Sequence, residues 1–288
     1  MATTAVPGPT VDAIVVNFNT RELLRKSLAS LHASRHPVRR IFVVDNASAD
    51  GSAQMVTAEF PDAVLLYMPK NLGFARANNA AFALSDADAV LLLNSDAELS
   101  ADALGALVAA LAADRRLGIA GPVLVGGDGR VQYEGGRHDP SILGEFGNIT
   151  HLNTRLPRSV FGRYLMNDWD HRSTRDVPVL SGACMLIRRS ALGGRLFCED
   201  FFMYGEDIEL CQRLRATGWR MRYVSAAEVA HRGGATSRRA RASMRVAGVV
   251  SMAQLLRRRR GPLYAAGYVA TVPIAWPLGG LVRKAWPR

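Results

Sequence analysis

The feature that most constrains this chain is a regular alternation of short apolar runs with helical patterns in its first 113 residues. Residues 11–18, 40–44, 63–68 and 89–93 have the length and apolar content of strands in a sheet with both faces covered. Helical spacing of apolar side chains lies between and after them, over residues 21–33, 52–60, 75–84 and 101–113. This pattern predicts an α/β fold with a mainly parallel sheet flanked by helices.

Polar side chains gather where three of these predicted strands end. The clusters are Asn17 with Asn19, Asp45 with Asn46, and Asn94 with Asp96. Open parallel sheets bind ligands at the carboxyl ends of their strands. One such cluster would be explained by strand termination and helix capping. Three clusters on successive strands favour a binding site.

The second half of the chain is less regular. Residues 126–178 contain scattered Gly, Pro, Arg, His and Asn with weak periodicity, which is typical of long functional loops or poorly ordered segments. Beyond them the pattern predicts a strand over 179–188, a helix over 207–216 and a strand over 219–224.

Three positions carry chemistry that a fold alone does not require. Asp96 lies in a turn after an apolar strand, where a carboxylate can hold a hard divalent cation. Asp207 opens a helix after an aromatic run, so it is either a helix cap or a fixed catalytic base. His231 precedes two glycines in a basic turn, where it is either structural or a metal or phosphate contact.

Taken in order, these motifs resemble those of family 2 glycosyltransferases with the GT-A fold, and the bacterial rhamnosyltransferase-like branch in particular. The similarity runs from about residue 11 to residue 237. The matching segments are Val15-Val16-Asn17-Phe18-Asn19, Val44 through Ser52, Asn71-Leu72-Gly73-Phe74-Ala75 with Asn78, Leu93-Asn94-Ser95-Asp96, Ser181-Gly182-Ala183 and Glu206-Asp207.

The resemblance implies a role for each matching position. The donor nucleotide sugar would lie against Phe18, Asn19, Asp45, Asn46, Arg76, Asn78, Asn94, Ser95, Gly182 and Ala183. Asp96 and His231 would hold a divalent cation, Mg²⁺ or Mn²⁺, while Asp207 acts as base and Glu206 positions the acceptor. The implied reaction is an inverting transfer of a sugar such as rhamnose to a hydroxyl of a glycan or polyprenyl-linked acceptor in cell-envelope polysaccharide synthesis.

Two motifs depart from the family pattern. The metal motif is Asn94-Ser95-Asp96 in place of Asp-x-Asp, so Asp96 would carry the metal without a second carboxylate there. The later motif ends in Glu209 where Asp is commoner, a position expected to be secondary.

Positive charge is concentrated at the C-terminal end. Glu228 is the last acidic residue, and residues 229–288 hold twelve Lys or Arg, more than the whole net charge of +11. Residues 1–228 therefore sum to about −1. Arg257–Arg260 forms a basic block, followed by residues 261–282 without a charged side chain.

This organisation predicts a leader at 1–10, a glycosyltransferase domain at 11–237 and a basic, apolar helical tail at 238–288. The domain would divide into a nucleotide-sugar half at 11–125 and an acceptor half at 126–237. The uncharged stretch is long enough to cross a bilayer, but Pro262, Pro273 and Pro277 favour a peripheral helix on the cytoplasmic face of the cell membrane. A helical cap on the domain, or a dimer contact, is the alternative.

Other function classes fit less well. A dinucleotide-binding dehydrogenase requires G-x-G-x-x-G after its first strand, and Asn17-Phe18-Asn19-Thr20-Arg21 lacks it. A sugar nucleotidyltransferase would carry a basic, glycine-rich N-terminal loop, which is missing. A non-catalytic basic protein could use the tail, but the near-neutral body argues against nucleic acid as a partner. Three cysteines without a C-x-x-C pair indicate reduced thiols in the cytoplasm.

Overall fold

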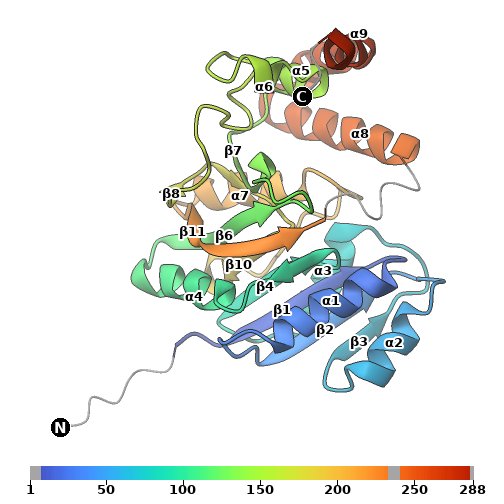
Figure 1. Ribbon diagram of the computed structural model, residues 1–288, viewed down its shortest axis with the longest axis vertical. Coiled ribbons are helices and arrows are strands. Elements are labelled where there is room, and N and C mark those ends of the chain that lie inside the picture. The colour runs from blue at the N-terminus through green and yellow to red at the C-terminus, as the bar shows by residue number, and fades with distance from the viewer. Residues whose placement is uncertain (1–7, 233–240, 286–288) are drawn as a thin grey trace.

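A computed structural model describes residues 8–232 and 241–285, without the side chains of 241–243 and 283–285. Its centre is a nine-stranded mixed sheet in the order β3-β2-β1-β4-β10-β6-β11-β5, with β8 paired to β11 (Figure 1). The strands of the N-terminal part are β1 (Val11–Asn17), β2 (Arg40–Asp45), β3 (Val64–Tyr67) and β4 (Ala89–Asn94). These four are parallel, as the sequence predicts, and the α/β fold class is confirmed.

Helices cover both faces of this sheet. On one face, α1 (Arg21–His32), α2 (Ser52–Glu59) and α4 (Ala103–Ala113) bury apolar side chains such as Leu28 and Leu107 against Ala13 and Val15. On the other face, α3 (Phe74–Phe82) and α7 (Glu206–Ala216) pack against Ile14. Successive residues of β1 thus enter opposite cores, which explains its unbroken apolar sequence.

The rest of the sheet contains strands that the sequence pattern did not predict. The strand β6 (Leu117–Val125) contains Gly118, Gly121 and Pro122, which weaken a strand signal. Its partner β11 (Arg220–His231) runs seven residues beyond the predicted end at 224, with an irregularity between Val224 and Glu228. The short β5 (Ala97–Leu99) pairs with the end of β11.

The single strand predicted over 179–188 is wrong. The structure has β9 (Val179–Leu180), which pairs with β7 (Gly136–Arg137), and β10 (Cys184–Arg188), which lies antiparallel between β4 and β6. The break falls at Ser181-Gly182-Ala183. Leu180 and Cys184 therefore belong to two different sheets, and the residues between them form a turn from β9 into β10.

Residues 126–178 are folded rather than loose. They form a 3₁₀ turn, η1 (Tyr133–Gly135), the helices α5 (Ile142–Thr150) and α6 (Leu152–Arg155), and β8 (Arg175–Asp176). A second short turn, η2 (Arg189–Ala191), follows β10. Ser141 caps α5, its hydroxyl accepting a hydrogen bond from the Gly144 amide at 3.1 Å.

The C-terminal region forms a helical hairpin of α8 (Arg241–Arg260) and α9 (Pro262–Ala285), joined by Gly261 with φ +90°. Figure 1 shows both helices beside α5 at the end of the molecule opposite β3. Pro262 suits the first turn of a helix. Pro273 and Pro277 lie inside α9, so the predicted helical tail is present with both prolines within the helix. Of the predicted tail at 238–288, residues 238–240 and 286–288 lie outside the described residues.

The hairpin packs on the domain. Leu255 of α8 is buried in the main core, and Leu256 joins Tyr268 and Val272 in a smaller core beside α5. Residues Pro262–Val282 of α9 are nevertheless long and apolar enough to cross a membrane, with 28% of the segment buried. This packing fits the alternative of a helical cap on the domain, and α9 also presents an apolar outer face.

The three cysteines, Cys184, Cys198 and Cys211, are all free and buried. Burial raises the pKa of both Cys184 and Cys211.

Candidate functional site at the carboxyl ends of the strands

A cavity of about 360 Å³ lies where β1 and β4 end. The register of the sheet places Asn17 of β1 beside Asp45 of β2, and Val16 beside Asn94 of β4. The expected residues in its wall are Phe18, Asn46, Asn94, Ser95, Asp96, Gly182, Ala183, Glu206, Asp207 and His231. Residues from 18 to 231 thus meet at one place, as expected of an open α/β sheet.

A buried hydrogen-bond network fixes the strand ends behind this cavity. The Asn17 amide donates to Asp45 Oδ1 and to the Ser48 hydroxyl, both at 3.0 Å. The Thr20 hydroxyl bonds Asn17 Oδ1 at 2.6 Å and lies 2.8 Å from the Ser95 hydroxyl. Asp45 is fully buried, so its carboxylate holds the loop instead of lining the cavity.

Asn46 holds the next wall in place. Its side-chain amide donates to the Gly73 carbonyl at 3.2 Å and accepts from the Leu72 amide at 3.1 Å. Gly73 has φ +82°, and a Cβ there would lie 2.3 Å from the Phe202 carbonyl oxygen. Only glycine allows this approach, which brings Phe202 to the mouth of the cavity.

Asp207 lies in the first turn of α7, after Gly205 with φ +94°. Its Oδ2 accepts a hydrogen bond from the Gly182 amide at 3.2 Å and pairs with Arg137. Arg137 is largely buried. Burial alone would lower the pKa of its guanidinium, but the negative charge of Asp207 outweighs that effect and raises the pKa. These contacts hold the Asp207 carboxylate at the cavity wall in one orientation.

Glu206 is buried beside Asp207. The pKa of Glu206 lies well above its usual range, mainly because the side chain is buried and also because Asp207 places a negative charge beside it. Its Oε2 is enclosed and has no hydrogen-bond partner in the described part of the chain. Near neutral pH, Glu206 is therefore poised as a neutral donor to a ligand, next to an acceptor-only carboxylate.

Asp96 and His231 face each other across the end of β11. The Asp96 Oδ1 atom lies 3.4 Å from His231 Nε2. On the far side of the ring, Gln132 Nε2 donates to the His231 carbonyl at 2.8 Å, which leaves Gln132 Oε1 2.7 Å from His231 Nδ1. Because that oxygen can only accept, Nδ1 carries the hydrogen, and in the neutral ring Nε2 has its lone pair toward Asp96.

This arrangement suits a divalent cation. A ligating histidine usually has its other nitrogen fixed by an outer hydrogen bond, the role that Gln132 fills here. Among the described residues no cluster of three or more His, Cys, Asp or Glu forms a metal cage. Two protein ligands leave several coordination positions open, as required for an ion that also binds diphosphate oxygens.

Four of the expected donor residues lie outside the cavity wall. Asp45 is the buried residue described above. Asn19 accepts a hydrogen bond from the Ala49 amide at 2.8 Å, and Asn78 bonds the Phe74 carbonyl of its own helix at 2.9 Å. Arg76 is largely exposed and lies 3.6 Å from Glu199. These residues shape the neighbouring loops and do not line the cavity.

Sequence reasoning missed several residues of the site, three of them in the 126–178 segment and others, such as Phe202 and Met244, beyond it. Glu134 and Arg137 line the cavity from the 126–178 segment, and Gln132 orients His231. No motif marked them, because that segment has no periodicity. Glu209, expected to be secondary, pairs with Arg213 at 3.2 Å on its own helix and does not line the cavity.

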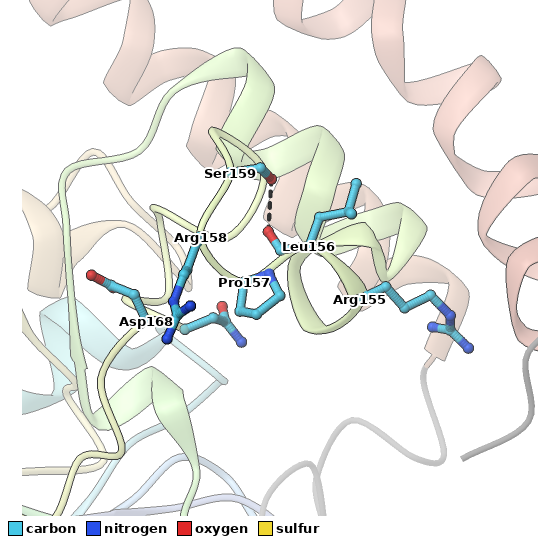
Figure 2. Close-up of a pocket in the computed structure, with 7 residues that line it drawn as sticks. Arg155, Leu156, Pro157, Arg158, Ser159 and Asp168 are labelled. Atoms are coloured by element: carbon cyan, nitrogen blue, oxygen red, sulfur yellow. Dashed lines mark hydrogen bonds between the residues drawn. The ribbon is translucent and has the colours of Figure 1, made fainter.

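A broader hollow, of about 570 Å³, lies on the segment after α6. Figure 2 shows it lined by neighbours in sequence, with Arg158 and Asp168 at one side and the Ser159 hydroxyl bonded to the Leu156 carbonyl at 2.7 Å. All its lining residues come from 155–168, without any strand-end carboxylate. We therefore assign the chemistry to the cavity at the strand ends.

Comparison with known proteins agrees with this geometry. The sequence model of a family described as "Glycosyl transferase family 2" matches residues 12–195. The N-acetylglucosaminyl-diphospho-decaprenol L-rhamnosyltransferase of Mycobacterium tuberculosis is 34% identical over 233 residues, covering 76% of this chain and 74% of the relative. An N-acetylglucosaminyltransferase of Rhizobium meliloti is 28% identical, covering 78% of this chain and 51% of the relative.

Solved structures share the fold at lower identity. A mannosyltransferase from Pyrobaculum calidifontis, solved with GDP-Man and Mn²⁺, aligns with a TM-score of 0.59 and 19% identity, covering 97% of this chain and 75% of that one. GalNAc-T7, solved with UDP, GalNAc and Mn²⁺, also gives a TM-score of 0.59, with 16% identity, 79% of this chain and 44% of that one. The chain therefore belongs to glycosyl transferase family 2 and is a glycosyltransferase with the GT-A fold.

Proposed function

We propose that this glycosyltransferase is inverting and uses a divalent cation. The observation that carries the proposal is a single cavity with a fixed carboxylate, Asp207, and an Asp96–His231 pair that can hold a metal. One base and one cation site suffice for a single displacement.

The residues of the cavity can perform the reaction in one step. Asp207 accepts the proton of the acceptor hydroxyl while that oxygen attacks the anomeric carbon of the donor. The bond from that carbon to the diphosphate breaks, the diphosphate leaves with the electron pair, and the anomeric configuration inverts. Glu206 donates a hydrogen bond to the acceptor, and Gly182 leaves room beside Asp207. A cation held by Asp96 and His231 would neutralise charge on the leaving diphosphate.

The donor side of the cavity is the part built from residues 11–125. Phe18 offers ring surface for a nucleotide base, and Asn94 and Ser95 offer polar atoms near the diphosphate; Phe202, from the other half, faces the same cavity and adds ring surface. The part built from residues 126–232 supplies Asp207, Glu206 and Arg137 and receives the acceptor. We assign these two parts as donor and acceptor halves, although one continuous sheet contains strands of both.

For the substrates, we propose rhamnose as the transferred sugar and a polyprenyl-diphosphate-linked sugar as the acceptor, in cell-envelope polysaccharide synthesis. This rests on the activity for which the M. tuberculosis relative is named and on a similarity that covers most of both chains. An acceptor of this kind would place the enzyme at the cytoplasmic face of the cell membrane.

The helical hairpin offers a surface for peripheral membrane contact. Leu263, Ile274 and Leu281 of α9 have 88%, 62% and 63% of their surface exposed. A groove of about 330 Å³ with aliphatic walls lies between α8 and α9, next to Arg257 of the basic block. Exposed apolar side chains beside arginines fit the interface of anionic lipids, where each surface Arg contributes about 1 kcal/mol.

A donor screen tests the proposed function. The purified chain is incubated with UDP-, GDP- and dTDP-sugars, with Mg²⁺ or Mn²⁺, and slow donor hydrolysis is followed without acceptor. We expect one donor to be hydrolysed and EDTA to stop the reaction. Hydrolysis that is unaffected by EDTA would refute the metal site, and failure to bind any nucleotide sugar would refute the whole proposal.

A further inference from the structure

A second cavity, of about 220 Å³, adjoins the first. Glu134 and Arg137 line both cavities, so the wall that holds Asp207 is also the boundary between them. The rest of this second cavity comes from α5, α8, α9 and the segment around Tyr164. Among the described residues of these elements, Met244 of α8 is the one that also lines the first cavity.

The inner end of the second cavity is polar and incompletely bonded. Glu145 of α5 is 7% exposed, and its Oε1 atom is enclosed without a hydrogen-bond partner in the described part of the chain. Burial raises the pKa of this carboxyl to about 7. The Nε atom of Arg137 is likewise enclosed and unbonded among the described residues. Buried polar atoms are normally bonded, so two such atoms at one cavity indicate a polar ligand.

The outer end of the second cavity is apolar. Ile149 comes from α5, Val249 and Met252 from α8, and Tyr268 and Trp276 from α9. Trp276 is 42% exposed, so this wall continues to the exposed face of α9. A polar inner end and an apolar outer end match an amphiphilic ligand whose chain leaves toward the hairpin.

Charged side chains of both signs line this cavity: Glu134 and Glu145 lie beside Arg137, which pairs with Asp207, and Arg245 is the cation that can face an anionic ligand. Arg245 of α8 is exposed and lines the cavity, and no acidic residue follows Glu228 in the sequence. Arginine binds phosphate oxygens through several N–H donors at once. A soluble neutral glycan would need neither this charge nor the apolar wall, whereas a prenyl diphosphate sugar uses both.

We propose that this second cavity is the acceptor site and that it takes the lipid end of a prenyl-diphosphate-linked sugar. The acceptor hydroxyl lies at Asp207 beside Arg137, and the sugar bonds to Glu145. The diphosphate faces Arg245, and the first prenyl units lie on Met252 and Trp276. This inference rests on the proposed sugar transfer and specifies what recognises the acceptor.

Two soluble acceptors test the proposal. One is N-acetylglucosaminyl diphosphate joined to a ten-carbon prenol, and the other is the same sugar diphosphate joined to a methyl group. For the wild-type full chain without membranes, we expect a KM at least about tenfold lower for the prenyl acceptor than for the methyl acceptor. A tenfold gain in affinity needs only the free energy released when a small apolar surface is buried, and the prenyl chain buries such a surface.

Variants then separate the two ends of the cavity. Trp276→Ala should remove most of the prenyl advantage while leaving the KM for the methyl acceptor and for the donor unchanged, and Trp276→Phe should restore it. Arg245→Gln should raise the KM for both acceptors about tenfold, and less at high salt. Glu145→Gln should also raise both. The matched control is Leu143→Ala, which removes an exposed apolar side chain from the same α5 helix outside the cavity.

Equal KM values for the two acceptors in the wild type would overturn the proposal. So would a Trp276→Ala variant that remains folded and keeps the full prenyl advantage. Donor hydrolysis without acceptor is measured on the same samples. Intact metal-dependent hydrolysis with no prenyl preference refutes the acceptor site alone, whereas loss of hydrolysis in the wild type refutes the proposed function.

Discussion

The two sides of the cavity at the strand ends are built in different ways. On the donor side, each wall comes from a short motif directly after a strand, such as Asn94-Ser95-Asp96 after β4. On the proposed acceptor side, Arg137 of β7 lines this cavity, whereas Glu145 of α5 and Trp276 of α9 line the second cavity that adjoins it, and α9 is far from the other two elements in the sequence. The difference shows that a nucleotide-binding edge can be specified by local sequence, whereas an acceptor site can depend on how helices pack.

The two sides meet at Asp207, so its variant gives the largest effect. Asp207→Asn keeps the size of the side chain but cannot accept the proton, and we expect the kcat of transfer to fall by about 10³-fold. Donor affinity by calorimetry should stay close to wild type, because the donor walls are untouched. A variant with wild-type turnover would show that another group is the base.

The next effect isolates the donor side. Asp96→Ala removes one of two expected metal ligands, and we expect metal-dependent donor binding to weaken by about 10²-fold or more. Gln132→Ala leaves both ligands but frees the His231 ring, and a loss of about 10- to 100-fold in metal affinity is expected. Calorimetry with donor and Mn²⁺, with and without EDTA, measures both. The metal assignment fails if EDTA leaves wild-type donor affinity unchanged.

The helical hairpin has both a buried side that packs on the domain and an exposed side, and one leucine from each side can be compared. Leu255 is 2% exposed in the main core, so Leu255→Ala should lower the free energy of unfolding by about 2–5 kcal/mol. The matched control is Leu263→Ala on the neighbouring helix, where 88% exposure predicts a change within about 0.5 kcal/mol. Chemical denaturation gives both values. Equal small effects would mean that α8 is not part of the folded domain.

Point variants in the hairpin test membrane contact better than deletion of the whole tail. Deletion after residue 237 would remove Leu255 from the core as well as the apolar face of α9. Membrane contact is better tested by Leu263→Ser with Ile274→Ser in a liposome flotation assay. We expect the full chain to float with anionic liposomes at low salt and the double variant to remain in solution. Absence of flotation by the full chain would leave the hairpin a packing role alone.

The smallest effect is a pH dependence of stability on the acceptor side. Burial raises the pKa of Glu145 to about 7, so the neutral side chain is the form that the folded protein favours. Its contribution to the free energy of unfolding is therefore fully present below about pH 4.5 and is lost as the pH rises through 7. Glu145→Gln has no such loss, so its advantage over wild type should grow by about 1–3 kcal/mol between pH 4.5 and pH 8. Denaturation at several pH values measures it. A difference that is constant with pH would show that folding does not raise the pKa of Glu145.

The sequence predicted the parts of this molecule that depend on local pattern. Strands β1 to β4 and Asp96 follow from apolar runs and from the residues that end them, and Asp207 follows from its place at the start of a helix after an aromatic run. Strand β6 was not predicted because Gly and Pro interrupt it, and its stability comes from β10 and β11 on either side. Gln132, Arg137 and Glu145 could not be predicted, since only tertiary packing brings them to the site.

One fixed carboxylate beside one proposed cation site suits a single displacement, so inversion at the anomeric carbon is the central claim. The most direct test is the anomeric configuration of the first product formed from the donor that passes the hydrolysis screen, determined by NMR within one turnover. The account predicts inversion relative to the donor, with Asp207→Asn forming the same anomer at a rate about 10³-fold lower. A product that retains the donor configuration would contradict it.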